Sequence, residues 1–429
     1  MYIHEKDNWT EFRWDTNALT DLLESVGRKQ GFLYGRLSSL GFDSKLRAMA
    51  ETLTYDIVYS SEIEGVRLNV DEVRSSLTRR LGVENVKQTA PSHYIDSVVA
   101  VMLEAMTDYN KPLTKEKLCA WQAAFFPMGY SEGYEIEIGK YRTREEHIVS
   151  GMFGRERIHY IAPVPDRVEK EMEKFLDWFN TKESTSSIIR SAIAHLWFVS
   201  IHPFEDGNGR LARILSDMLL AQADGSEFRF YNVSSQINKD KKRYYQILEI
   251  VQCGNGDITE WLVWYASTLL LALDEAEATI STILNKSFFW QNAVNVVLSE
   301  RQKRILNLFL DGYEAKITSK TWASLAKCSK DTAIRDIQDL IEKNILREDI
   351  LGAKRPSYSI IYDMEDITQF FSEVEVIKEN DAYSLTALYK GKTIVHERIL
   401  SLDAERYQKG ELPLRNLLNK YCSYLRISR

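Results

Sequence analysis

The chain has few cysteines and no apolar stretch long enough to span a membrane. Its four cysteines, Cys119, Cys253, Cys328 and Cys422, lack the spacing of a zinc site or of a disulfide framework. This scatter indicates reduced thiols and a cytoplasmic protein. The most apolar segment, 261–273, is shorter than the ~20 residues of a transmembrane helix. The first residues also lack the apolar core of a secretory signal, so no membrane partner is expected.

An excess of positive charge is also absent. The 429 residues include 55 Lys and Arg against 62 Asp and Glu, which gives a formal net charge of -7. This balance argues against tight non-specific binding to nucleic acid. The hydrophobic fraction of 44% and the charged fraction of 27% are those of an ordinary folded protein. The length predicts two to three domains at roughly 150 residues each.

The string 202–213, by contrast, is dense in chemically active residues and reads His-Pro-Phe-Glu-Asp-Gly-Asn-Gly-Arg-Leu-Ala-Arg. Because glycine adopts positive φ at little cost, Gly207 and Gly209 let backbone N–H groups converge on an anion. An apolar helical pattern begins directly afterwards, which predicts that this cradle lies at a helix N-terminus. Arg210 and Arg213 are three residues apart, so both project from one side of the first turn and can clamp phosphates.

This string resembles the signature of the Fic (filamentation induced by cyclic AMP) domain family, His-x-Phe-x-Asp/Glu-Gly-Asn-Gly-Arg-x-x-Arg, and it matches every fixed position. The segments 141–144, 160–163 and 234–245 are also similar to the family. The resemblance extends from about residue 1 to residue 285. It implies a mainly α fold, in which a Fic-type helical core carries a β-hairpin called the flap.

The resemblance also implies a reaction, because most Fic proteins transfer AMP from ATP to a Ser, Thr or Tyr hydroxyl of a target protein. By position, His202 is similar to the general base that takes the hydroxyl proton, and Asp206 to the ligand of a Mg²⁺ ion on the phosphates. The residue types suit these roles independently. Histidine has an ordinary pKa of about 6.5, and a hard cation prefers carboxylate and water oxygens. The expected cofactors are ATP, as a substrate, and Mg²⁺.

The same resemblance implies which residues bind the nucleotide. Asn208 and the amides of Gly207 and Gly209 resemble the anion hole of the family. Arg210 and Arg213 resemble its clamps for the β- and γ-phosphates.

Other residues near the signature have simpler interpretations. Phe204 resembles the buried residue that anchors the signature loop, and Tyr245 is similar to a residue that packs on adenine, as aromatic rings do on bases. Ordinary packing of Tyr244 and Tyr245 is the alternative. His195 lies in a segment that is apolar nearly all round, so we expect a satisfied core histidine.

A second motif lies far upstream of the signature. Ser60, Glu64 and Gly65 form the pattern Ser-x-x-x-Glu-Gly, which resembles the inhibitory helix motif of Fic proteins in the class where this helix precedes the core. The resemblance implies that Glu64 pairs with Arg213 and removes the γ-phosphate clamp. The alternative is that Glu64 is an ordinary charge at a helix end, followed by Gly65 as a C-cap.

The expected organisation is a small N-terminal helical domain with the inhibitory motif at 1–90, the Fic catalytic core at 91–285, a winged helix-turn-helix-like domain at 290–362 and an α+β tail of unknown role at 363–429. Apolar periodicity predicts helices at 14–40, 46–60, 95–108 and 115–126. Near the flap, 148–161 has the composition of a hairpin around Gly151. The family resemblance implies that this hairpin docks the target protein by strand addition, and a plain surface hairpin is the alternative.

The segment 300–361 reads as three helices followed by a two-stranded wing. Lys330 and Arg335 on the third helix suit contact with DNA, but Asp331 and Asp336 share that helix. DNA is therefore not the favoured partner. We expect a protein-interaction or dimerisation surface, and hence a homo-oligomer, instead.

These features together predict a protein adenylyltransferase. Its own Glu64 is expected to inhibit it. Removal of AMP from a modified protein, or transfer of another phosphate-containing group, is the first alternative, because both use the same residues. A nucleotide-sensing DNA-binding regulator is the second. The presence of His202 argues against the second, since a sensor needs phosphate clamps but no base.

Overall fold

The computed structural model describes residues 2–38, 42–83, 89–131, 133–151, 155–181, 185–226, 229–294, 296–313, 315–350, 356–361, 371–379, 382–389, 393–399, 401–409 and 414–422. The chain divides into two compact units, Met1–Ile280 and Ser281–Arg429. Within the described ranges, no helix combines the length and the apolarity that a bilayer crossing requires.

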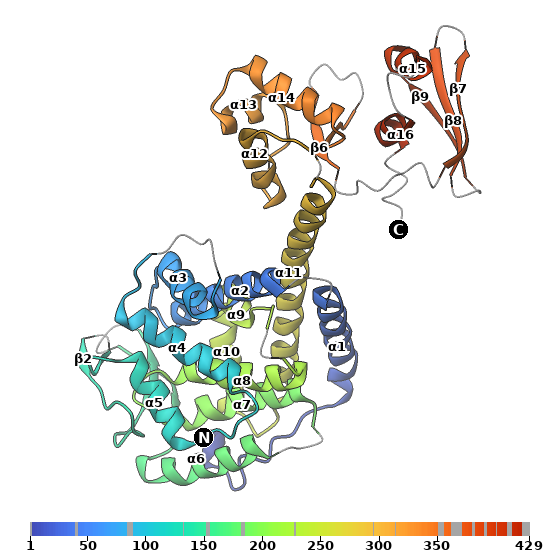
Figure 1. Cartoon of the computed structure of the whole chain (residues 1–429). Helices are drawn as coiled ribbons and strands as arrows, with labels where there is room; N and C mark the ends of the chain where they lie inside the picture. The colour runs from blue at the N-terminus through green and yellow to red at the C-terminus, as the bar shows by residue number, and fades with distance from the viewer. Residues whose placement is uncertain are drawn as a thin grey trace. The chain divides into compact units, whose positions relative to one another are not determined.

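The first unit is almost entirely helical (Figure 1). In chain order its elements are η1 (Ile3–Glu5), α1 (Asn17–Ser38), α2 (Phe42–Ile63), α3 (Val70–Leu81), α4 (His93–Thr107), α5 (Lys115–Phe125), β1 (Tyr130–Ser131), β2 (Tyr134–Glu135), β3 (His147–Ser150), β4 (Arg157–Ile161), α6 (Pro165–Asn180), α7 (Ser187–Ile201), α8 (Asn208–Asp224), α9 (Val233–Lys239), α10 (Lys241–Gln252) and α11 (Thr259–Asn292), of which α11 continues into the second unit.

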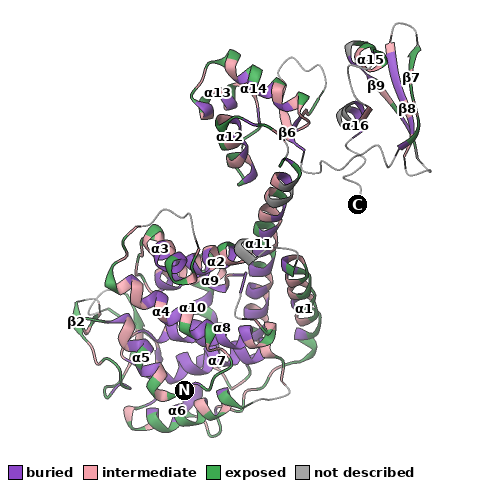
Figure 2. Cartoon of the chain, viewed as in Figure 1, coloured by how far each residue is buried: buried purple, intermediate pink, exposed green. Residues whose placement is uncertain are grey.

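The centre of the first unit is the pair α7 and α8, which pack along each other and are largely buried (Figure 2). A helix that is apolar all round is stable only inside a protein, and every residue of α7 from Ile188 to Ile201 is buried. Each fully buried Ile, Leu or Phe contributes ~1.5–3 kcal/mol relative to an exposed one. His195 is 1% exposed and shares a 2.9 Å hydrogen bond with the Tyr244 hydroxyl, which confirms the predicted core histidine.

The N-terminal helices were predicted with ends that differ slightly from those observed. The expected helices at 14–40 and 46–60 correspond to α1 and α2. Helix α3 was not predicted, because most of its residues are polar. Its signals lie at its ends, where the Asn69 side chain accepts hydrogen bonds from two first-turn amides and Gly82 adopts a φ of 69° at the C-cap.

The predicted hairpin at 148–161 is confirmed as the antiparallel pair β3 and β4, and its tip at 152–154 lies outside the described residues. The register shifts between Ile148 and Val149. Tyr160 is buried and donates a 2.8 Å hydrogen bond to the Ser200 carbonyl of α7, whereas Val149 and Ile158 are exposed. The hairpin is therefore anchored on one side and open on the other.

The second unit contains α12 (Glu300–Leu310), α13 (Ser319–Ala326), α14 (Lys330–Glu342), β5 (Leu346–Glu348), β6 (Tyr358–Ile360), β7 (Phe371–Glu379), β8 (Ala382–Tyr389), β9 (Thr393–Ile399), α15 (Ser401–Gln408) and α16 (Leu414–Cys422). The first five elements follow the expected order of three helices and a hairpin, and β7, β8 and β9 form an antiparallel sheet.

Asp336, one of the acidic residues noted on the third helix of this unit, is buried at 7% exposure. It accepts two 2.7 Å hydrogen bonds from Arg301 and one of 3.1 Å from the indole N–H of Trp322. Asp336 therefore joins α12, α13 and α14 in the core, and its charge is neutralised by Arg301.

Candidate active site

His202 follows the last residue of α7 and adopts a left-handed conformation with φ 52° and ψ 60°. Its backbone N–H caps the helix by donating to the Phe198 carbonyl, and its Nδ1 lies 3.2 Å from the Val199 carbonyl. A ring nitrogen facing a carbonyl carries the proton, so Nε2 is left as the acceptor. Burial lowers the pKa of His202 to about 4, with a smaller contribution from the Arg142 guanidinium and against the hydrogen bond to the Val199 carbonyl, which keeps the ring neutral near pH 7.

The loop between α7 and α8 is held by Phe204. The Phe204 ring is fully buried and packs on the Tyr141 ring, with 5.4 Å between the two ring centres. The side chain of Asn208 donates to the Phe204 carbonyl at 2.7 Å and accepts from its N–H at 3.0 Å. Both polar atoms of that side chain are thus used within the loop. The side chain of Asn208 thus holds the loop, and the part of Asn208 in the predicted anion hole stays a prediction.

Arg142 supports the same loop from outside, and the sequence analysis gave it no role. It is 2% exposed and donates to the carbonyls of His202 at 2.7 Å and Arg144 at 2.7 Å. Its backbone N–H donates to the Pro203 carbonyl at 2.9 Å. A buried arginine whose donors all face carbonyls is a rigid brace, and its signal in the sequence was the family-like segment 141–144.

Helix α8 begins where Gly207 adopts a φ of 93°, as expected for a cradle at a helix N-terminus. Arg210 and Arg213 both point into the protein rather than into solvent, with exposures of 4% and 3%. The Arg210 guanidinium lies 4.7 Å and 4.8 Å from the ring centres of Phe125 and Phe126.

The inhibitory motif meets the signature at Arg213. Arg213 Nε donates to Ser60 Oγ at 2.8 Å, and Nη2 donates to the Ser60 carbonyl at 2.8 Å and to Glu64 Oε1 at 2.6 Å. The remaining nitrogen, Nη1, is buried and has no acceptor in the part of the chain that the structure describes. Gly65 has a φ of 83° and ends the motif after α2. Glu64 and Arg213 are therefore paired in this structure.

The Glu64 carboxylate also covers the start of α8. A Cβ atom placed on Gly209 would overlap Glu64 Oε1. The same carboxylate therefore lies over the helix N-terminus and on Arg213, the two features that attract a phosphate. In this structure, Glu64 thus lies beside Gly209 at the start of α8 while it is bound to Arg213.

Asp206 lies at the edge of the cradle. Its carboxylate accepts hydrogen bonds from the backbone N–H of the next residue, Gly207, and from the hydroxyl of Ser131 on β1. Among the described residues, no group of three or more His, Cys, Asp or Glu side chains can hold a metal alone. One carboxylate, with further oxygens from phosphates and water, fits the way Mg²⁺ is usually bound beside nucleotides. Ser131 could not be predicted, because it is remote in sequence.

Of the two tyrosines in α10, Tyr244 is buried and Tyr245 is 42% exposed. The Tyr245 hydroxyl donates to the Ile63 carbonyl at 3.3 Å, next to the inhibitory motif. Burial and then the Glu64 carboxylate raise the pKa of Tyr245. Tyr245 therefore borders the cradle, whereas Tyr244 belongs to the core.

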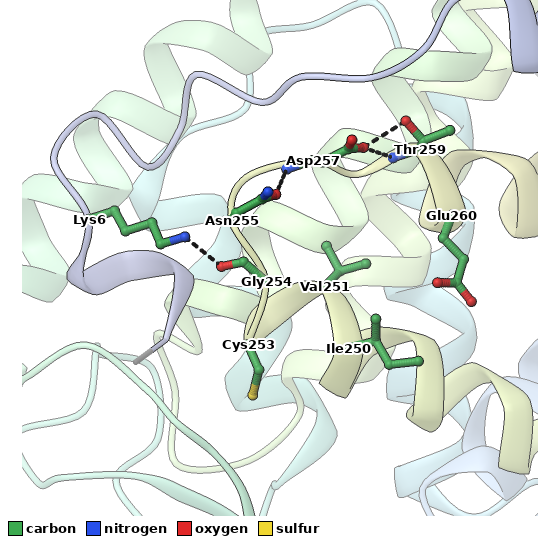
Figure 3. Close-up of a pocket in the computed structure, with 9 residues that line it drawn as sticks. All are labelled: Lys6, Ile250, Val251, Cys253, Gly254, Asn255, Asp257, Thr259 and Glu260. Carbon is green, nitrogen blue, oxygen red and sulfur yellow. Dashed lines mark hydrogen bonds between the residues drawn. The ribbon is translucent and has the colours of Figure 1, made fainter.

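A cavity of about 720 Å³ opens beside the loop that follows α10 (Figure 3). It is lined by Lys6, Ile250, Val251, Cys253, Gly254, Asn255, Asp257, Thr259 and Glu260. Lys6 Nζ donates to the Gly254 carbonyl at 2.8 Å, and Asp257 accepts from the Thr259 N–H at 2.9 Å. None of the lining residues belongs to the signature, so this cavity is not assigned to the nucleotide.

Comparison with known families decides what this arrangement is. Residues 112–220 match the Fic/DOC family. They form a Fic domain. Residues 2–83 match a family described as a domain of unknown function, DUF4172. The matched Fic segment includes the whole signature, whereas Glu64 and Tyr245 lie outside it.

The curated relatives that this chain matches include proteins named protein adenylyltransferase Fic. The relative from Nematostella vectensis is 25% identical over 250 residues, which are 57% of this chain and 53% of that protein. The relative from Drosophila mojavensis is 28% identical over 232 residues, 53% of this chain and 42% of that protein. The chain thus spans about half the length of these relatives.

Solved structures with a similar fold include a Fic family protein from Desulfovibrio desulfuricans G20. It is 19% identical, covers 81% of this chain and 97% of its own, and has a TM-score of 0.48. Fic-1 from C. elegans is 20% identical, covers 61% of this chain and 73% of its own, and has a TM-score of 0.45.

Proposed function

We propose that this protein is an adenylyltransferase that moves AMP from ATP to a hydroxyl side chain of a target protein, and that Glu64 inhibits it. The observation that carries this proposal is the Glu64 carboxylate bound to Arg213 over Gly209, in the place suited to a phosphate. The names of the curated relatives support the same reaction.

In the proposed reaction, the hydroxyl oxygen of the target attacks the α-phosphorus of ATP. The new oxygen–phosphorus bond forms as the bond to pyrophosphate breaks, and the hydroxyl proton passes to His202 Nε2. The Gly207 and Gly209 amides and the clamps Arg210 and Arg213 hold the phosphates. Asp206 would hold Mg²⁺, which neutralises phosphate charge when bound.

The target is proposed to dock on the flap formed by β3 and β4. The structure leaves Val149 and Ile158 of this hairpin exposed, at 46% and 47%. A two-stranded sheet retains free backbone donors and acceptors at its edges, which an extended peptide can pair with. The Tyr160 anchor on α7 keeps such a peptide close to the end of the helix that carries His202.

Replacing Glu64 by glycine is expected to raise AMP transfer at least tenfold. The Glu64 side chain is 24% exposed and that of Arg213 is 3% exposed. The pair is therefore worth more than the ~0–1 kcal/mol of a surface ion pair, and each ~1.4 kcal/mol released is tenfold in rate. The measurement is incorporation of α-labelled ATP into the protein itself and into lysate proteins.

The matched control is Glu62→Gly. Glu62 is two residues earlier, in α2, and its carboxylate accepts a 3.1 Å hydrogen bond from the Asn238 side chain rather than from Arg213. The Glu62→Gly variant should therefore not be activated. Labelled AMP-protein is also offered to each variant. If Glu64→Gly leaves transfer unchanged but abolishes AMP removal, Glu64 serves a hydrolase and the inhibitory proposal is wrong.

The pH dependence of transfer provides a separate prediction. Because the pKa of His202 is lowered to about 4, its neutral form persists well below the ordinary value of 6.5. Transfer by Glu64→Gly should therefore stay constant from pH 8 to below pH 6, and it should fall only as the pH approaches about 4. An acid limb centred near pH 6.5 in kcat/KM would contradict this environment for His202.

A further inference from the structure

Two series of small or polar residues face each other where α2 packs on α8. Within each series the members are four residues apart and so lie on one side of the helix. The series at α2 is Asp56, Ser60 and Glu64, and the series on α8 is Gly209, Arg213 and Asp217. We call this contact the polar seam.

The polar seam runs in opposite directions along the two helices. At its first end, Glu64 covers Gly209 and accepts a 2.6 Å hydrogen bond from Arg213. One turn earlier in α2, Ser60 accepts two hydrogen bonds from the same arginine, both 2.8 Å long. This end includes the anion site, and the Glu64 side chain there is 24% exposed.

The second end of the polar seam is closed by Arg229, from the segment between α8 and α9. Arg229 Nη1 donates to Asp217 and Nη2 donates to Asp56. The side chains of Arg229 and Asp56 are completely buried, and that of Asp217 is 4% exposed. A planar guanidinium can serve two carboxylates at once, and buried charges are tolerated only when paired. Arg229 thus ties α2 to α8 inside the core.

We propose that Asp56 and Arg229 are positioning residues that hold α2 in the register at which Glu64 occupies the anion site. This inference rests on the proposed function, in which Glu64 excludes part of the nucleotide. Asp56 precedes Glu64 by eight residues, about 12 Å along a helix at 1.5 Å per residue. The exposed end is open to competition by phosphate, whereas the buried end is not. The tie at Arg229 therefore returns Glu64 to Arg213 after each displacement.

Two isosteric variants separate this role from a general loss of stability. Asp56→Asn removes the charge on α2 and leaves Arg229 paired with Asp217. Asp217→Asn removes the charge on α8 and leaves Arg229 paired with Asp56. Arg229 lies only five residues beyond the end of α8 at Asp224, so in Asp217→Asn its bond to Asp56 still links α2 to this part of the chain, and this variant is the milder one. Both changes preserve volume at the same buried arginine.

The first measurement is incorporation of α-labelled ATP by each purified variant of the full chain. A charged hydrogen bond is replaced by a neutral one, so Asp56→Asn should raise transfer roughly fivefold to tenfold, and Asp217→Asn less than twofold. Adding Asp56→Asn to Glu64→Gly should cause no further increase, because the tie acts only through Glu64. Equal activation by both aspartate variants, or by neither, would overturn the proposal.

The second measurement does not depend on catalysis. Hydrogen–deuterium exchange of residues 56–63 should be faster in Asp56→Asn than in Asp217→Asn, without nucleotide, and equal exchange counts against the tie. If Glu64→Gly fails to activate while this difference in exchange is present, the proposed function fails and the tie stands.

If Asp56→Asn does not fold, Arg229→Lys replaces it, because a lysine cannot span both carboxylates. The same activation of transfer is expected for Arg229→Lys, and its absence would overturn the proposal.

Discussion

A protein that carries both Glu64→Gly and His202→Ala is expected to transfer AMP about 10²–10⁴-fold more slowly than Glu64→Gly alone, which is the usual effect of losing a general base. The Nδ1 contact with Val199 leaves Nε2 to accept the hydroxyl proton, and no other role in the site is assigned to this ring. His202 precedes the cradle at Gly207 and Gly209, so the affinity for ATP should change little. Single-turnover labelling measures transfer, and calorimetry measures nucleotide binding.

The matched control for this prediction is His396→Ala, because His396 is an exposed histidine in the second unit. It should leave both transfer and binding unchanged. If the His202 variant labels its targets at the rate of its parent, another group takes the proton and the assigned role of His202 is wrong.

The variant Asp206→Ala is expected to lower transfer at least a hundredfold at millimolar Mg²⁺ in the Glu64→Gly background. A metal ion on phosphate oxygens is worth several kcal/mol of charge stabilisation, and each ~1.4 kcal/mol is tenfold. Asp206 is the carboxylate at the edge of the cradle, where Ser131 orients it. When transfer is measured at increasing Mg²⁺ concentrations, Asp206→Ala should need a higher Mg²⁺ concentration than its parent for half-maximal transfer.

The adjacent acid provides the control. Glu205 accepts a 2.9 Å hydrogen bond from the Glu137 N–H and makes no contact with the cradle amides among the described residues. Glu205→Gln should therefore leave the Mg²⁺ requirement nearly unchanged. Binding of Mn²⁺ in the presence of ADP, followed by electron paramagnetic resonance, gives a readout that does not need turnover. Equal Mn²⁺ affinity in Asp206→Ala and its parent would refute the metal role.

Sequence alone predicted the parts of the site that are contiguous in the chain. His202, Asp206 and the glycines of the cradle lie within one string, and their geometry follows from a helix end, a tight loop and a helix start. The link from Glu64 to Arg213 spans 149 residues and came only from resemblance to a family. Periodicity alone cannot indicate which face of one helix meets another.

The supporting residues could not be predicted for the same reason. Arg142, Ser131 and Arg229 reach the site from separate segments, and each is an ordinary polar residue in its local sequence. Arg142 and Arg229 are important because they are buried, where an unpaired charge is costly, whereas Ser131 is important through its hydrogen bond to Asp206. Asn208 adds a second role that the signature did not indicate, since its side chain holds the loop at Phe204.

The overlap of Glu64 with the space above Gly209 has a thermodynamic consequence. In the proposed site, a carboxylate and a phosphate cannot occupy that space together, so docking of Glu64 and full binding of ATP would exclude each other. Linkage then requires reciprocity. A ligand that binds only the chain with Glu64 displaced must raise the affinity for ATP by some factor, and ATP must raise the affinity for that ligand by the same factor. In the proposed mechanism, a higher concentration of ATP therefore favours the state in which Glu64 is displaced from Arg213.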